Sequence, residues 1–148
     1  MTTRSGSPAP PQPGEVIRYA YLWRRERDGG RESGVKDRPA AVVLTASDRE
    51  GRPLVYVVPI TSQAPERPEH AILVPSDVRR RLGLQEAPCW IVVTELNRFV
   101  WPGPDLRPVE AGRGFSHGLL PRSLFLAVRD AAVAYIRATP RALVSRSE

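Results

Sequence analysis

The stretch that decides the fold is residues 36–63, KDRPAAVVLTASDREGRPLVYVVPITSQ. Two apolar, β-branched runs, Ala40–Leu44 and Leu54–Val58, suit the pleated surface of a sheet. The polar segment between them contains Gly51, and glycine tolerates the positive φ angle that a tight turn requires. The sequence therefore predicts an antiparallel β-hairpin.

A cation precedes the first strand of this hairpin, and two hydroxyls follow the second. In an antiparallel pair, the start of one strand lies beside the end of the other, so we expect Arg38 to lie near Thr61 and Ser62. A guanidinium presents a planar fork of donors that matches a phosphate. The same residues also fit simple edge charge and turn chemistry, and both interpretations stay open at this point.

The composition indicates a single globular domain. The chain has 148 residues, 41% of them hydrophobic and 26% charged, which is typical of a folded protein that can bury a core. The 16 prolines and 11 glycines predict many turns and short elements. We therefore expect a β-rich (α+β) fold, an antiparallel and partly closed barrel with a C-terminal helix packed against it.

The net charge of +6 comes almost wholly from arginine, since Lys36 is the only lysine. Arginine binds phosphates bidentately, so an anionic partner is expected, although a GC-rich coding sequence produces the same bias. The single cysteine, Cys89, excludes an internal disulfide and fits a reducing compartment. No apolar run reaches the ~18 residues that a membrane span needs. These features predict a cytoplasmic protein without a membrane partner.

Residues 1–13 are rich in Thr, Ser and Pro and predict a mobile N-terminal tail, and residues 139–148 predict a C-terminal one. The domain between them spans residues 14–138. Besides the hairpin, patterning predicts strands at 15–23, 70–74 and 90–94, a helical turn capped by Ser76 and ending at Gly83, and a helix over 119–136. A charged loop, 24–36, follows the first strand.

Arg-Pro, two apolar strands and Pro-Ile-Thr-Ser-Gln together resemble the PemK/MazF toxins, the ribonuclease halves of type II toxin–antitoxin pairs. Gly14-Glu15-Val16-Ile17 resembles the opening strand of that family. Residues 91–98 resemble its later strand, which ends in an acidic and then a basic residue. The resemblance covers roughly residues 14–138, and it implies an SH3-like barrel that forms homodimers.

The resemblance also implies the activity. Family members are endoribonucleases that cleave single-stranded RNA at short preferred sequences without metal or cofactor. The 2′-hydroxyl attacks the phosphorus and leaves a 2′,3′-cyclic phosphate. Arg38 matches the active-site arginine of the family and Thr61 its threonine, whereas Glu95 falls where some relatives carry a proposed base. An antitoxin with a disordered segment that occupies the RNA channel is the implied protein partner.

Glu95 has two interpretations. Partial shielding of a carboxylate from water suits it to act as a base near neutral pH, but an ion pair with Arg98 or Arg38 is equally compatible with its position. Kid-type enzymes carry an arginine two residues before this acid, where Val93 stands here, so the resemblance does not extend to a mechanism with that arginine as the acid.

Further candidates for substrate contact flank these residues: Ser62, Gln63, Asp37, Arg98 and Trp101. Trp90 is expected in the core, whereas Trp101 before Pro-Gly-Pro is expected at the surface, where it can stack on a base or form a dimer contact. Both histidines, His70 and His117, are interpreted as solvated, and no metal site is predicted. The Arg79–Arg81 cluster is interpreted as a solvated helix end rather than a phosphate contact.

Two alternatives remain. The first is a toxin-fold relative that blocks a protein target such as gyrase, as CcdB does, and it requires neither Arg38 nor Thr61, because fold does not fix function. The second is a degenerate, non-toxic family member. The loop 24–36 and the insertion 101–118 decide whether an RNA channel is open, and their sequences do not specify the RNA that is cleaved.

Overall fold

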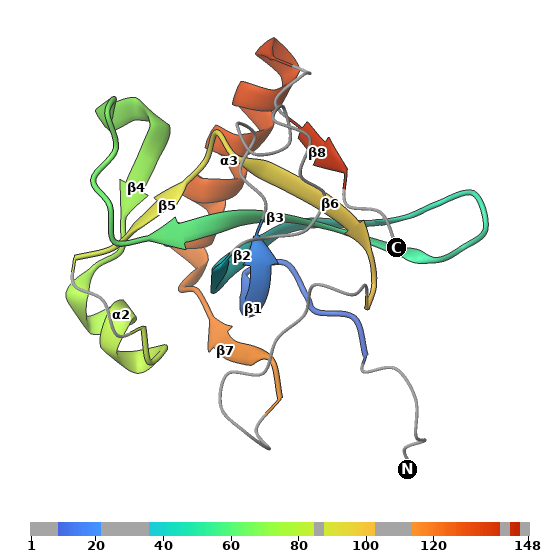
Figure 1. The fold of residues 1–148 in the computed structure, drawn as a ribbon, viewed down its shortest axis with the longest axis horizontal. Coiled ribbons are helices and arrows are strands. Elements are labelled where there is room, and N and C mark those ends of the chain that lie inside the picture. The colour runs from blue at the N-terminus through green and yellow to red at the C-terminus, as the bar shows by residue number, and fades with distance from the viewer. Residues whose placement is uncertain (1–8, 22–35, 85–87, 103–113, 140–142, 146–148) are drawn as a thin grey trace.

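The computed structural model describes residues 9–21, 36–84, 88–102, 114–139 and 143–145 (Figure 1). Within these ranges the chain forms mostly strands, with a long helix near the C-terminus. In chain order the elements are β1 (Glu15–Tyr21), β2 (Lys36–Ser47), β3 (Pro53–Thr61), the 3-10 turn η1 (Pro68–His70), β4 (Ala71–Leu73), α2 (Ser76–Arg81), β5 (Trp90–Val92), β6 (Leu96–Val100), β7 (Ser116–Leu119), α3 (Arg122–Ala138) and β8 (Leu143–Ser145).

The strands join into one sheet with the order β4-β5-β3-β2-β1-β7, and β6 pairs with β3. These pairings are antiparallel, whereas β8 adds to β6 in parallel. The described strands at the two ends of this order, β4 and β7, do not pair with each other, so the sheet does not close. The predicted β-rich α+β class with a C-terminal helix is confirmed.

The predicted hairpin is formed by β2 and β3, which pair from Ala40–Pro59 to Ser47–Pro53. Both strands are longer than their apolar runs, and Figure 1 shows the hairpin extending beyond the other strands. Its turn is fixed by Asp48, the carboxylate of which accepts hydrogen bonds from the backbone N–H groups of Glu50 and Arg52. Gly51 takes a φ of +81°, which is the reason for a glycine there.

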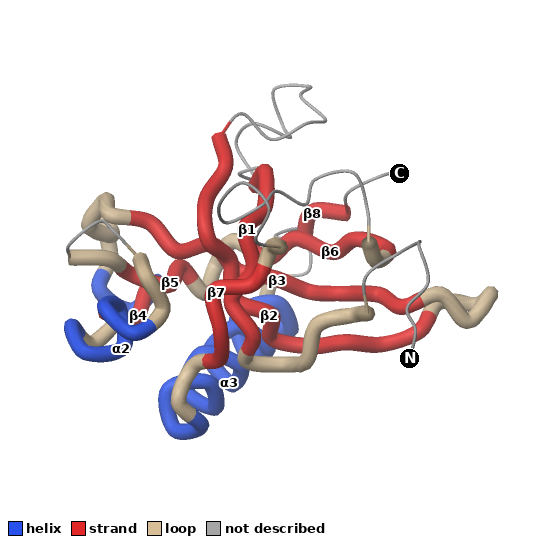
Figure 2. Tube along the Cα trace, turned by 90° about the horizontal axis from the view of Figure 1, so that it is seen from below, coloured by secondary structure: helices blue, strands red, loops and turns tan. Residues whose placement is uncertain are grey.

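Apolar side chains are buried on both faces of the sheet. Along β2, Ala41 and Val43 belong to a first core, which is covered by α3 and α2. Ala40 and Val42, which point the other way, belong to a second core. Figure 2 shows α3 lying along one side of the strands. Burial on both faces explains why the strands read as continuous apolar runs instead of alternating ones.

Helix α3 starts later than predicted. Pro121 is its N-cap, and Leu119 belongs to β7, a strand that the sequence did not predict. The residue before a proline disfavours the helical conformation, which explains the later start. Val128 and Ala132 are buried against the first core, whereas Ala127 is exposed. None of the described helices is long and apolar enough to cross a bilayer.

Other boundaries differ from the predictions in smaller ways. The N-cap of α2 is Pro75, and no side chain caps it, so the assignment of Ser76 as the cap is wrong. Strand β5 ends at Val92, because the chain turns there with a backbone hydrogen bond from Glu95 to Val92. Three residues of the predicted C-terminal tail form β8. Trp23, the loop segment 24–35 and residues 103–113 lie outside the described residues.

Candidate functional site

Arg38 and Thr61 lie where β2 and β3 cease to pair. The last paired residues are Ala40 and Pro59, and Arg38 on β2 and Thr61 on β3 each lie two residues beyond that pair. The ladder ends here because prolines at 39 and 59 have no N–H to donate. On its other edge, β3 pairs here with β5, with Thr61 opposite Trp90. Arg38 and Thr61 are both half-buried.

Strand alternation assigns these two residues to one face of the sheet. By alternation, the side chain of Arg38 lies on the same side of β2 as Ala40, and that of Thr61 lies on the same side of β3 as Val57. Ala40 and Val57 are both buried in the second core. The residue paired with Arg38 on the other neighbouring strand is Tyr19, which is fully buried in that core. The candidate site therefore borders the second core, on the face opposite α3.

Glu95 immediately precedes β6, in the turn that leads out of β5. The residue two positions later, Asn97, is fully buried and pairs with Val57 of β3. Extending the alternation of β6 back by one residue assigns Glu95 to the same face as Asn97 and Phe99. Glu95 is half-buried. A carboxylate thus borders β3 from the side opposite β2 and Arg38.

The Thr61 hydroxyl is oriented by the local backbone. Its Oγ1 accepts a hydrogen bond of 3.2 Å from the N–H of Gln63, which is a turn that threonine commonly forms at a strand end. Because Oγ1 is the acceptor there, the hydroxyl proton is left to donate to another group. Ser62 and Gln63 are exposed beyond it. The strand end therefore offers hydroxyl donors next to the predicted position of the arginine.

A row of aromatic rings supports the site from within the second core. Tyr19 stacks on Phe99 with ring centroids 4.8 Å apart, and Phe99 lies 6.0 Å from Trp101. Phe115, just before β7, meets the edge of Trp101 at 5.0 Å. Offset and edge contacts of this kind stabilise a core beyond simple burial. The strand that carries Arg38 is thus paired with a rigidly packed neighbour.

This packing overturns the assignment of the tryptophans. Trp101, which was predicted at the surface, is only 5% exposed, whereas Trp90, which was predicted in the core, is half-buried. The turn between β5 and β6 resets the alternation, so the odd-numbered residues that follow it face the second core. Trp101 is therefore a core residue of this chain and is not a base-stacking surface in this structure. The role of Phe115 in this row carries no signal in the sequence.

Arg98 does not group with Arg38. It pairs with Tyr56 of β3, five residues before Thr61, which corresponds to roughly 16 Å along the strand. Its neighbours Asn97 and Phe99 face the second core, so Arg98 points to the other face. Its Nε and Nη2 donate to the Oγ of Ser145 in β8. The structure therefore does not bring Arg98 together with Arg38, and its predicted contact with substrate stays a prediction. Asp37 pairs with Ala20, but its side chain lies outside the described part of the structure.

His117 is not the solvated histidine that was predicted. It lies at an irregularity in the pairing of β7 with β1, where its Nδ1 donates to the carbonyl of Leu82 at 3.0 Å. Its Nε2 is buried and has no hydrogen-bond partner among the described residues. Burial lowers the pKa of His117, and the positive charge of Arg18 lowers it further, against the raising effect of the Leu82 carbonyl. Arg81 adds a second link between α2 and β7 by donating to the carbonyl of Leu119.

The other candidates from the sequence lie away from the strand end. His70 is half-buried, and its ring meets Tyr135 edge-on at 5.9 Å, so it packs beneath α3 instead of standing in solvent. Arg80 is exposed at the end of α2, as expected for a solvated helix end. The strand end thus combines a cation, hydroxyl donors and a carboxylate, a set that can hold a phosphodiester and accept the proton of a hydroxyl that attacks it. No protein-family model matches the chain, and a search of curated proteins found no match either.

Proposed function

We propose that this protein is a metal-independent endoribonuclease of the PemK/MazF type that cleaves single-stranded RNA. The observation that supports the proposal best is the common face of Arg38, Thr61 and Glu95. They come from three separate segments of the chain, and strand alternation continued beyond the last paired residues puts all three on the side of the second core. The motif that resembles the toxin family contains the same arginine and threonine.

Each residue has a role that its chemistry supports. Arg38 stays protonated and stabilises the charge that develops on the phosphoryl oxygens. Thr61 donates its hydroxyl proton to one of the same oxygens, because its Oγ1 is held by Gln63. Glu95 accepts the proton of the attacking 2′-hydroxyl. The new bond joins the 2′-oxygen to phosphorus and the bond to the 5′-oxygen breaks. The departing 5′-oxygen takes up a proton from water, which leaves a 2′,3′-cyclic phosphate and a 5′-hydroxyl.

The family-level expectations that go with this activity are part of the same proposal. We propose that the open sheet is a partly closed, SH3-like barrel of the PemK/MazF/CcdB type, that the active form is a homodimer, and that a cognate antitoxin occupies the RNA channel. The fully buried Tyr19 and Asn97 beside the site fit a scaffold that holds the reactive residues rigidly.

The experiment is cleavage of a long single-stranded RNA in the presence of EDTA. We expect cuts at a few sites by the wild-type protein and a loss of about 10²–10³-fold in rate for Arg38→Ala, as for removal of one electrostatic stabiliser in other enzymes. Arg98→Gln is the matched control, because it also removes one arginine but on the other face of the sheet. Equal rates for Arg38→Ala and wild type would overturn the proposal.

Expression in a sensitive bacterium separates the alternatives. Growth inhibition that depends on Arg38 supports the nuclease. Inhibition that persists in a folded Arg38→Ala variant favours a CcdB-like protein target instead. Unchanged growth with the wild-type protein favours a degenerate family member.

A further inference from the structure

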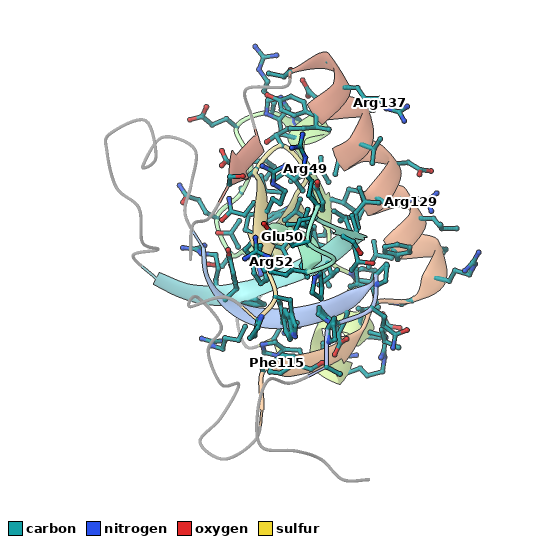
Figure 3. All side chains as sticks on the ribbon, turned by 90° about the vertical axis from the view of Figure 1, so that its right-hand side faces the viewer. Arg49, Glu50, Arg52, Phe115, Arg129 and Arg137 are labelled. Atoms are coloured by element: carbon teal, nitrogen blue, oxygen red, sulfur yellow. The ribbon has the colours of Figure 1, made fainter. Side chains whose placement is uncertain are left out.

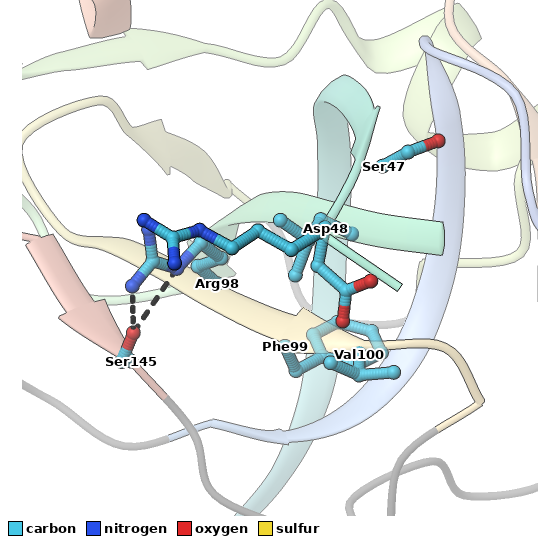
Figure 4. A pocket seen from close by; sticks show the side chains of 8 residues that line it. Ser47, Asp48, Arg98, Phe99, Val100 and Ser145 are labelled. Carbon is cyan, nitrogen blue, oxygen red and sulfur yellow. Dashed lines mark hydrogen bonds between the residues drawn. The ribbon is translucent and has the colours of Figure 1, made fainter. Parts of the chain in front are cut away.

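A second polar site lies at the other end of the hairpin from Arg38. A recess of about 440 Å³ is bounded there by the turn residues 47–49, by Leu54 of β3, by residues 98–100 of β6 and by Ser145 of β8. Figure 4 shows Arg98 reaching along this recess to Ser145. Ligand sites in proteins are commonly recesses of about 300–1,000 Å³, so the volume suits a small organic molecule.

Arg98 is the half-buried cation of this recess. Two of its nitrogens, Nε and Nη2, donate to a single neutral acceptor, the Ser145 hydroxyl. Among the described residues, Arg98 forms no ion pair with a carboxylate. A guanidinium binds an oxyanion more strongly than a neutral hydroxyl, and often through two parallel hydrogen bonds. Arg98 is therefore oriented by β8 while its charge is left for an anionic ligand.

The one carboxylate in the lining does not cancel this charge. Oδ1 of Asp48 accepts the backbone N–H groups of Glu50 and Arg52 at 2.9 and 2.8 Å, and its Oδ2 accepts Nε of Arg52 at 2.7 Å. Both oxygens are thus held within the hairpin turn. Arg49 lines the recess as well and is exposed. The lining therefore presents two arginines and an acid that is already paired.

The remaining lining is apolar. Leu54 and Val100 are half-buried, and by alternation they lie on the same face of the sheet as Arg98. Phe99 completes this part of the lining. A planar apolar group can lie against such a surface while an attached anion reaches the arginines. The recess thus combines the two features that recognise a nucleotide.

We propose that this recess binds a nucleoside monophosphate. The phosphate contacts the guanidinium of Arg98, the hydroxyl proton of Ser145 and the side chain of Arg49, and the base lies against Leu54 and Val100. The site is distinct from the strand end with Arg38, because it lies roughly 16 Å away along β3 and on the other face of the sheet. It does not depend on the ribonuclease activity.

Calorimetric titration of the full-length protein with 5′-AMP tests this site. We expect saturable binding of 5′-AMP, and at least about tenfold weaker binding of both adenosine and inorganic phosphate, since each lacks one of the two recognised groups. Arg98→Gln should weaken 5′-AMP binding by about tenfold or more, which is the usual effect of removing a charged hydrogen-bond donor. Arg38→Ala should bind 5′-AMP like the wild type.

Two further variants keep the test decisive if Arg98→Gln disturbs β8. Arg49→Gln changes the turn alone and should weaken binding several-fold. Arg129→Gln removes an arginine on the outer side of α3, where it pairs with Asp130, and should leave binding unchanged (Figure 3). The proposal is overturned if wild-type protein does not bind 5′-AMP, if phosphate binds as tightly as 5′-AMP, or if neither Arg98→Gln nor Arg49→Gln weakens binding more than Arg129→Gln does.

Discussion

Phe99 is the side chain on which the packing beside the candidate site depends most. It is 2% exposed and contacts two rings of the second core, Tyr19 at 4.8 Å and Trp101 at 6.0 Å between centroids. Tyr19 is in turn the β1 partner of Arg38. Phe99→Leu keeps most of the buried apolar volume but removes both ring contacts.

The expected cost follows from these two contacts. An aromatic pair contributes about 0.5–1.5 kcal/mol beyond burial, so the loss of two pairs should lower the free energy of unfolding by about 1–3 kcal/mol. Phe99→Ala also leaves a cavity and should cost about 3–5 kcal/mol. In a chain of this size, 1 kcal/mol lowers Tm by about 2–4 °C, so Phe99→Leu should lower Tm by about 2–12 °C.

Urea unfolding followed by circular dichroism measures these free energies. The matched control is Phe125→Leu, because Phe125 is a half-buried residue of α3, and its ring lies 5.8 Å from the Arg129 guanidinium. That change should cost less than about 1 kcal/mol, within the usual range for hydrophobic substitutions that conserve volume. A Phe99→Leu protein no less stable than the Phe125→Leu protein would refute the central role given to the aromatic row.

Three other predictions concern pH, backbone strain and the arginine. The pKa of His117 is lowered in the folded protein, so the imidazole binds a proton more readily in the unfolded chain, and stability should fall as the pH drops through 6.5 and level off below the folded-state pKa. His117→Gln should flatten this part of the profile of urea midpoint against pH. An unchanged slope would contradict the assignment. Gly118→Ala should lower the free energy of unfolding in urea by about 1–3 kcal/mol, because Gly118 has a φ of +119° and an added Cβ would lie 3.0 Å from Leu82. The control is Gly51→Ala, where the added Cβ meets nothing within 4 Å. A loss no larger than that of Gly51→Ala would refute the contribution of the contact with Leu82. Arg38→Lys should retain charge without the bidentate fork, and its cleavage rate should fall between those of wild type and Arg38→Ala; a wild-type rate would exclude a need for the fork.

The hairpin was predictable because two apolar runs and a glycine turn within one short stretch specify it locally. The position of Arg98 was not, because the turn between Val92 and Glu95 resets the alternation, and only the pairing with β3 shows which face each residue of β6 takes. Trp101 is buried for the same reason, because the reset alternation turns the odd-numbered residues after the turn toward the second core.

His117 and β8 show a second limit. His117 lies at an irregularity in the β1–β7 pairing, and such irregularities re-aim side chains without a clear sequence signature. Strand β8 has only three residues, and it forms through a parallel pairing with a segment more than forty residues earlier. Neither feature has the local periodicity on which sequence interpretation relies.

The central claim is that Arg38 and Thr61 act on the same phosphate. It is tested most directly by the cleavage rates of wild type, Arg38→Ala, Thr61→Val and the double variant on one RNA site in EDTA. Residues that stabilise one phosphoryl group act as a unit, so we predict that the double variant is only slightly slower than Arg38→Ala alone. Rate losses that multiply in the double variant, or a wild-type protein that does not cut RNA, would contradict the account.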